Sequence, residues 1–278
     1  MRCRSALRRA ALLLVAFISF APSVFAQTAA VPAAAGSEPG AKTWIGREKE
    51  FEDYIKTAEI VSIKDIPIGV TKPQKAILKP GGPVEAIAWK YIPPKRYQGY
   101  WESYKSEIAA YELDKLLGLG MVPPTVEKRH KGELGAAIMW CPETKSFKDT
   151  GGVPKNIPPQ QLLRWNKQII RTKMFDNLIY NMDPNLGNWL VDPAWNLILI
   201  DHTRSFTTDK KMAHEDMGRI DVELWEKMQA LTEESLNAAL GEWIGKREVK
   251  AMIERRDKMR DIIAKLVKDK GEAVVFVK

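Results

Sequence analysis

The second half of the chain carries apolar residues at helical spacing. Residues 160–180 form one long amphipathic pattern, because apolar side chains recur there every three or four positions. Its apolar set is Leu162, Leu163, Trp165, Ile169, Ile170, Met174, Phe175 and Leu178. Helical patterns return over residues 221–268, and residues 273–277 are a candidate for a last strand. The pattern predicts a half that is rich in helices.

The first half contains shorter apolar runs of strand length. Residues 75–78 and 85–90 are candidate strands, and the Pro-Gly-Gly-Pro sequence at residues 80–83 predicts a hairpin turn between them. Residues 121–126 and 134–140 are two more candidate strands. We therefore expect a small antiparallel sheet in this half.

One helix and one further hairpin complete the pattern. Residues 103–117 have helical spacing, and Gly118 is placed to end that helix. In the second half, two apolar runs at residues 188–191 and 196–200 are separated by Asp-Pro, which suits a small hairpin. A strand-rich half with one main helix, followed by a helix-rich half, predicts an α+β fold with two lobes.

The N-terminal residues have the pattern of an export signal. A basic start is followed by an apolar run at residues 10–21 and by small residues that end at Ala26. This order predicts a secretory signal peptide that is cleaved after Ala26. An uncleaved membrane anchor is the alternative, but the run is shorter than the roughly 20 residues that a spanning helix needs. We expect an exported protein, periplasmic or secreted, without a stable membrane span after cleavage.

These patterns suggest four parts of the chain. Residues 1–26 are the predicted signal peptide, and residues 27–45, rich in Ala, Pro and Gly, are a predicted flexible linker. Residues 46–140 form the predicted strand-rich N-lobe. Residues 141–278 form the predicted helix-rich C-lobe.

Charge and cysteine content argue against a nucleic-acid-binding protein and against a protein stabilised by disulfides. The formal charge is +8, and without the four arginines of residues 1–26, which contain no acid, it is only +4. A body so close to balance gives little reason to expect nucleic acid as a partner. The two cysteines are Cys3 and Cys141, so cleavage leaves Cys141 alone. We therefore expect no intramolecular disulfide.

The densest group of polar residues lies around the predicted hairpin of the second half. Asp183 and Asn188 lie on the loop before its first strand, and Asp201 ends its second strand. A hairpin brings these positions to one end, so all three side chains can face one point. Phosphoryl transfer needs such a set: a carboxylate to orient the acceptor hydroxyl, and an amide and a carboxylate to hold Mg²⁺.

The same residues also have structural interpretations. Asp-Pro-Asn at residues 183–185 can be a simple turn, with Asn188 as a capping residue. The histidines do not offer another metal site, because His130, His202 and His214 are far apart and have no zinc spacing. We expect a packing role for His202.

At this point the sequence resembles a known family. The motif Phe-Asp-x-Leu-Ile-x-Asn-x-Asp at residues 175–183, followed by Asn188, a hairpin and Ile-Asp at 200–201, resembles atypical protein-kinase-like enzymes. These include the secretory-pathway kinases of the four-jointed and Golgi casein kinase type, the HipA-type kinases and the phosphoinositide-kinase-like proteins. Residues 106–125 resemble the first-lobe helix and following strand of the secretory-pathway kinases. The resemblance covers roughly residues 60–205 and implies a two-lobed protein-kinase-like fold.

The resemblance implies a role for each of eight residues. Lys90 would contact the phosphates of ATP, and Glu107 would pair with Lys90. Asp183 would be the catalytic carboxylate, and Asn188 and Asp201 would be ligands of Mg²⁺ or Mn²⁺. The hinge beside the adenine would be formed by Met139, Trp140 and Cys141.

For two of these assignments the sequence offers alternative residues. Lys75 or Lys79 could replace Lys90, and Glu102 or Glu112 could replace Glu107. We expect Asp176 and Asn181 to brace the catalytic loop by hydrogen bonds rather than to touch substrate. Cys141 has no neighbour that would make it a reactive thiolate.

The sequence also departs from the family at three places. No Gly-x-Gly-x-x-Gly loop is present, and the candidate phosphate cover at residues 68–75 has a single glycine. Pro184 follows Asp183 where relatives often carry a basic residue, and Thr203 stands where many kinases have glycine.

The resemblance implies an exported ATP-dependent kinase that phosphorylates a hydroxyl. A protein hydroxyl is the first expectation, and a sugar or lipid headgroup is the alternative acceptor. A pseudokinase that binds nucleotide or a partner is the alternative, and a purely structural protein is a third.

Overall fold

A five-stranded antiparallel sheet forms the centre of the N-lobe in the computed structural model, which describes residues 41–66, 74–151 and 156–278. In spatial order its strands are β1 (Ile60–Asp65), β2 (Gln74–Leu78), β3 (Ala86–Lys90), β7 (Glu133–Met139) and β6 (Thr125–His130). The predicted hairpin of β2 and β3 is confirmed. The predicted signal peptide, linker residues 27–40 and most of the candidate phosphate cover lie outside the described residues.

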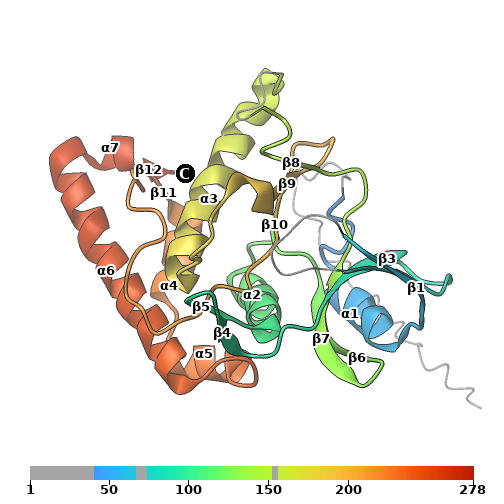
Figure 1. Ribbon diagram of the computed structural model, residues 1–278. Helices are drawn as coiled ribbons and strands as arrows, with labels where there is room; N and C mark the ends of the chain where they lie inside the picture. Colours follow the sequence, from blue (N-terminus) through green and yellow to red (C-terminus); the bar gives the residue numbers. More distant parts are fainter. Residues whose placement is uncertain (1–40, 67–73, 152–155) are drawn as a thin grey trace, which may run out of the picture. The chain divides into compact units, whose positions relative to one another are not determined.

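Helix α1 (Glu48–Thr57) packs against this sheet (Figure 1). Its residues Phe51 and Ile55 are buried and join the apolar side chains of the sheet, among them Ile87 and Trp89. The sequence analysis predicts neither α1 nor β1, because α1 is mostly charged and has only these two fully buried side chains.

Helix α2 (Tyr104–Leu117) lies between the sheet and the helices of the C-lobe, as predicted from residues 103–117 (Figure 1). The Ser103 hydroxyl accepts a hydrogen bond from the backbone N–H of Lys105 at 3.1 Å and caps the helix. Gly118 ends it with φ of +57°, a left-handed conformation that glycine adopts at little cost. Both ends of α2 are therefore fixed by local residues.

A short hairpin, which the sequence analysis does not predict, precedes α2. It consists of β4 (Lys95–Tyr97) and β5 (Tyr100–Glu102), and most of its side chains are exposed. We refer to residues 95–102 as the β4–β5 hairpin.

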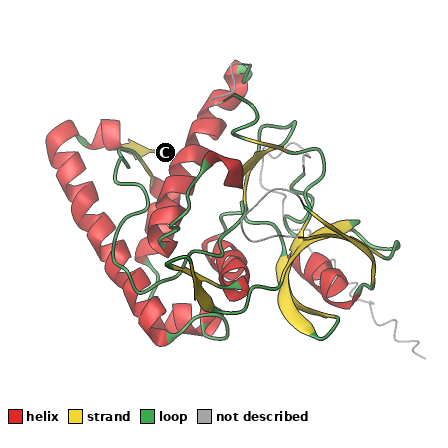
Figure 2. Ribbon diagram, viewed as in Figure 1, coloured by secondary structure: helices red, strands yellow, loops and turns green. Residues whose placement is uncertain are grey.

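The C-lobe is built around α3 (Leu162–Ile179), which matches the predicted helix at residues 160–180 (Figure 2). Around it lie α4 (Val222–Gln229), α5 (Glu233–Leu240) and α6 (Lys246–Lys270), with short 3₁₀ turns at η1 (Pro159–Gln161) and η2 (Leu186–Asn188). A small sheet contains β8 (Lys145–Ser146), β9 (Trp189–Val191) and β10 (Leu197–Leu199), and its β9–β10 pair is the predicted hairpin.

Two predicted strands are partly wrong. Residues 273–277 form α7 (Glu272–Val275) and then β12 (Phe276–Val277), which pairs with β11 (Ile220–Asp221). The strand predicted at residues 121–126 begins only at Thr125. The residues before it are drawn into a loop, because the buried carboxylate of Asp114 accepts hydrogen bonds from the N–H groups of Gly120, Met121 and Val122.

Residues 41–45, the first that the structure describes, pack against the rest of the protein. The sequence analysis places residues 41–45 in a flexible linker, but here Trp44 is only 1% exposed and packs in the cluster of the N-lobe sheet. The N–H of Ala41 donates to the Asp192 carboxylate at 2.8 Å, in the turn between β9 and β10. We call residues 41–45 the entry segment, and it contacts both lobes.

In the described part of the chain, no helix combines the length and the apolar character that crossing a membrane requires.

Candidate active site

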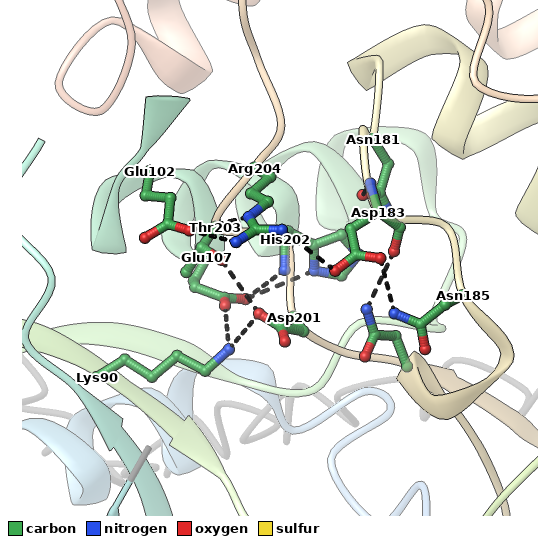
Figure 3. A network of polar contacts seen from close by, with 11 residues as sticks. Lys90, Glu102, Glu107, Asn181, Asp183, Asn185, Asp201, His202, Thr203 and Arg204 are labelled. Carbon is green, nitrogen blue, oxygen red and sulfur yellow. Dashed lines mark hydrogen bonds and ion pairs between the residues drawn. The ribbon is translucent and has the colours of Figure 1, made fainter. Parts of the chain in front are cut away.

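Three charged side chains meet between the lobes (Figure 3). The Lys90 Nζ atom, at the end of β3, lies 2.6 Å from Glu107 Oε1 and 2.7 Å from Asp201 Oδ1. Lys90 and Glu107 are buried, and Asp201 is partly exposed. One lysine therefore joins a residue of α2 to the carboxylate that follows β10.

Local structure explains why these side chains meet. Strand β3 is paired on both sides, so the position of Lys90 is fixed within the sheet. On β7, Gly135 lies so close to Lys90 that an added Cβ would be 2.4 Å from the Lys90 carbonyl oxygen. Glu107 stands in the first turn of α2, and its Oε2 atom accepts the backbone N–H of His202 at 3.0 Å. Both oxygens of Glu107 are thus engaged.

Burial and pairing act in opposite directions on these pKa values. Burial disfavours the charge of Lys90, but the carboxylates of Asp201 and Glu107 outweigh it and raise its pKa. Burial would likewise raise the pKa of Glu107, but Lys90 and the contact with His202 lower it to about 2. The ion pair is therefore charged on both sides at neutral pH.

Asp201 adopts an unusual backbone conformation with φ of +64°. Aspartate and asparagine tolerate this left-handed region better than other residues with a side chain. The Oδ1 atom also accepts the Thr203 hydroxyl at 3.1 Å. Among the contacts within the described residues, its other oxygen has no partner.

Asp183 stands on a braced loop, which we call the candidate catalytic loop (residues 181–188). Its N–H donates to the Asn181 side-chain oxygen at 3.1 Å, and Asn181 Nδ2 donates to Asp176 at 3.0 Å. His214 Nε2 lies 2.9 Å from the other oxygen of Asp176. The predicted bracing by Asp176 and Asn181 is confirmed.

Asn188 links this loop to the second strand of the hairpin. Its Nδ2 donates to the Asp183 carbonyl oxygen at 3.1 Å, and its own carbonyl oxygen accepts the N–H of Ile200 at 3.0 Å. Its side-chain oxygen has no partner among the described residues. The structure thus brings Asp183, Asn188 and Asp201 to one end of the hairpin, and Asp201 contacts Lys90.

The oxygen donors here suit Mg²⁺ or Mn²⁺. Both ions accept carboxylate and amide oxygens, and Mg²⁺ is usually held by one or two carboxylates together with substrate phosphates. Within the described residues, no cluster of three or more His, Cys, Asp or Glu side chains is placed to hold a metal. The carboxylates of Figure 3 are Glu102, Glu107, Asp183 and Asp201, and its cations are Lys90 and Arg204. This network has an excess of two negative charges, which a divalent cation would balance.

The predicted hinge residues lie outside the polar network. The Trp140 N–H donates to the Ala86 carbonyl oxygen at 3.0 Å, and the Lys75 ammonium lies 4.2 Å from the centre of the Trp140 ring. Cys141 is buried, and burial raises the pKa of its thiol to about 12. Their role beside a nucleotide remains a prediction.

The alternative residues for Lys90 and Glu107 all have other partners in the structure. Lys75 lies over Trp140, and Lys79 lies 3.7 Å from Glu59. Glu112 pairs with Lys115 on the same helix. Glu102 pairs instead with Arg204, which the sequence analysis does not identify. The one feature of the sequence that points to Arg204 is its position three residues after Asp201.

No protein-family model matches this sequence, and no curated protein matches it either. Solved structures match its fold. Golgi casein kinase with Mn/ADP bound superposes with a TM-score of 0.62 over 84% of this chain and 79% of that one, at 13% identity. Hydra Fam20 with sugar superposes with a TM-score of 0.62 over 84% and 92%, at 16% identity. The chain has an atypical protein-kinase-like fold.

The kinase-like fold confirms the α+β, two-lobed architecture that the sequence predicts. At 13–16% identity, the likeness concerns the fold alone. One structure of this fold family holds a nucleotide and a divalent metal, Mn/ADP. The geometry above brings Lys90, Glu107 and Asp201 into contact, and the functional roles of these residues, of Asp183 and of Asn188 are proposed below.

Proposed function

We propose that the protein is an exported ATP-dependent kinase that transfers the γ-phosphoryl group to a hydroxyl. The observation that carries the proposal is the buried Lys90, which bridges Glu107 at 2.6 Å and Asp201 at 2.7 Å. A lysine held between a helix carboxylate and a metal-binding aspartate is the arrangement that phosphoryl transfer uses.

Each residue of the site has a task in this reaction. Lys90 neutralises phosphate oxygens of ATP and keeps its position through Glu107. Asn188 and Asp201 hold the divalent ion, which neutralises phosphate charge when bound. Asp183 orients the acceptor hydroxyl. The acceptor oxygen bonds to the γ-phosphorus as the bond to the bridging oxygen of ADP breaks, and Asp183 accepts the hydroxyl proton.

The acceptor and the destination are parts of the same proposal. A protein hydroxyl is the first expectation, from the resemblance to the secretory-pathway kinases. Export is supported by the basic and apolar pattern of residues 1–26. Hinge contacts with the adenine are proposed for Trp140 and Cys141.

A pseudokinase is the second candidate, and one observation favours it. Thr203 stands where many kinases have glycine, and its hydroxyl binds Oδ1 of Asp201 at 3.1 Å, an added contact on this candidate metal ligand. Such a protein would bind nucleotide without transferring phosphate. Release of ADP therefore separates the two candidates.

The test is calorimetric titration of the full chain with an unhydrolysable ATP analogue, with and without Mg²⁺. We expect Mg²⁺ to tighten binding, and Asp201→Asn to remove this effect. Asparagine is the better variant, because it keeps the size of the side chain and tolerates φ of +64°. Asp53→Asn, at an exposed aspartate of α1, is the matched control and should bind as the wild type does.

Turnover is measured on the same proteins as ADP release from Mg-ATP, with a mixture of Ser- and Thr-containing peptides present to accept the phosphoryl group. We expect ADP release from Mg-ATP by the wild type, and a fall of about 100-fold or more in Asp183→Asn with its nucleotide affinity retained. Binding without ADP release would assign the pseudokinase role. No binding at millimolar nucleotide would exclude the kinase and a nucleotide-binding pseudokinase, and would leave a partner-binding pseudokinase or a structural protein.

A further inference from the structure

Arg204 lies where three segments of the chain meet. Its carbonyl oxygen accepts the N–H of Met182, on the candidate catalytic loop, at 3.3 Å. The neighbouring Thr203 carbonyl oxygen accepts the N–H of Ser103, directly after β5, at 3.1 Å. The backbone therefore fixes Arg204 against both the loop that carries Asp183 and the end of the β4–β5 hairpin.

The side chain of Arg204 joins the same two segments (Figure 3). Its Nε and Nη2 atoms lie 2.9 and 2.7 Å from Glu102 Oε1, and Nη1 lies 3.8 Å from Asp183 Oδ2. The guanidinium carbon lies 4.5 Å from the centre of the Tyr100 ring. The Arg204 and Glu102 side chains are only 13% and 4% exposed.

The guanidinium binds Glu102 by two hydrogen bonds and faces Asp183 as an ion pair at 3.8 Å, longer than a hydrogen bond. It is planar and presents its donors in a fixed fork, so one edge bound to Glu102 directs the remaining nitrogen toward Asp183. The other oxygen of Asp183 accepts the Asn185 amide at 2.9 Å. The Asp183 carboxylate is therefore contacted on both of its oxygens.

This contact supplies a feature that the sequence lacks. Pro184 follows Asp183 where relatives of the resembled family often carry a basic residue. We propose that Arg204 is a positioning residue that supplies this cation from the segment after Asp201. It holds the Asp183 carboxylate in its orientation toward the acceptor hydroxyl and couples that orientation to the β4–β5 hairpin. The proposal rests on the kinase function proposed above.

The hairpin forms one wall of a cavity of about 530 Å³ next to the candidate catalytic loop. The lining includes Arg96, Gly99 and Trp101 of the hairpin, and Met182, which precedes Asp183. Within the described residues, the Arg204 side chain forms no hydrogen bond or ion pair with Lys90 or Asp201. Loss of the Arg204 side chain should therefore lower the rate of phosphoryl transfer to the acceptor and leave the affinity for nucleotide unchanged.

The test compares Arg204→Gln and Arg204→Lys in the full chain. Two quantities are measured: the rate of ADP release from Mg-ATP, and the affinity for an unhydrolysable ATP analogue with Mg²⁺. We expect Arg204→Gln to lower the rate about 10-fold or more, with the affinity within about 3-fold of wild type. Arg204→Lys should recover part of the rate, because an ammonium keeps the charge without the fork.

A second pair of variants covers the case in which Arg204→Gln does not fold. Tyr100 and Tyr97 are cross-strand partners in the hairpin and both are exposed, but only Tyr100 lies against Arg204. We expect Tyr100→Leu to lower the rate about 3-fold, through the lost cation–π contact, and Tyr97→Leu to leave it unchanged.

Each outcome decides the proposal. Wild-type rates in Arg204→Gln and Tyr100→Leu would overturn it and leave the kinase function standing. An equal loss of rate and nucleotide affinity would assign Arg204 a general structural role and also overturn it. A wild-type protein that releases no ADP would overturn the kinase function and, with it, this proposal.

Discussion

Lys90 and Glu107 form a buried ion pair, and such a pair makes stability depend on pH. The pKa of Glu107 is lowered to about 2 in the folded protein, against an ordinary value of 4.5. Between these values the unfolded chain binds more protons than the folded one. The contribution of Glu107 is therefore complete above pH 4.5, and it is lost as the pH falls toward 2.

We predict that Glu107→Gln flattens this part of the pH profile. At pH 7 the variant should be less stable than the wild type by about 3 kcal/mol, because a buried pair is broken. The difference should shrink as the pH falls from 4.5 to 2. Urea denaturation over this range measures it, with Glu85→Gln, at an exposed glutamate, as the control. A constant difference at every pH would contradict the prediction.

At the residue scale the sequence predicts some partners and misses others. Lys90 and Glu107 are predicted from the resemblance to kinase-like proteins, which assigns a strand-end lysine and a helix glutamate as partners. The Arg204 contacts are not, because Glu102 is 102 positions away and lies on a hairpin without an apolar pattern. Only the folded chain shows that Glu102 belongs to Arg204 rather than to Lys90.

The end of α1 illustrates stabilisation at the scale of an element. The ammonium of Lys128, on β6, donates to the carbonyl oxygens of Ile55, Lys56 and Ala58 at 2.7–3.0 Å. The last carbonyls of a helix have no partner within the helix, and they carry its negative partial charge. One side chain of the sheet therefore caps the helix that packs on the sheet.

We predict that Lys128→Met destabilises the protein by about 2 kcal/mol, because one buried and two partly buried carbonyl oxygens lose a charged donor. Urea denaturation gives the total loss, and hydrogen exchange should show it in the amides of α1. Lys64→Met, at an exposed lysine of β1, should change stability by less than about 0.5 kcal/mol. Equal effects of the two substitutions would refute the capping role.

Elements differ in how much their own sequence specifies them. Helix α2 has both of its end signals, Ser103 and Gly118, and its prediction is confirmed. Helix α1 has a narrow apolar face and an end capped from β6, so its stability comes from tertiary contacts. Residues 273–275 contain two valines and read as a strand, yet they form the short helix α7, because tertiary context outweighs local propensity.

For the whole molecule, the division into a strand-rich lobe and a helix-rich lobe is what the sequence predicts best. The two-lobed α+β architecture follows from a strand-rich half and a helix-rich half, and the solved structures confirm it. The entry segment is the exception. Its Ala- and Lys-containing sequence has no periodic pattern, and its order depends on Asp192, about 150 positions later.

We predict that the entry segment stabilises the whole protein. A chain that begins at Thr43 lacks the N–H of Ala41, which the buried carboxylate of Asp192 accepts. It should lose about 1–3 kcal/mol relative to a chain that begins at Glu38, because a buried acceptor loses a donor. Urea denaturation of the two chains measures the difference, and equal midpoints would argue against the prediction.

The entry segment also has a mechanical consequence. Ala41 and Trp44 share one buried cluster with Cys141, so the chain arrives where the two lobes join. Force on the preceding chain would therefore act first on this buried cluster, and not on the outer part of either lobe.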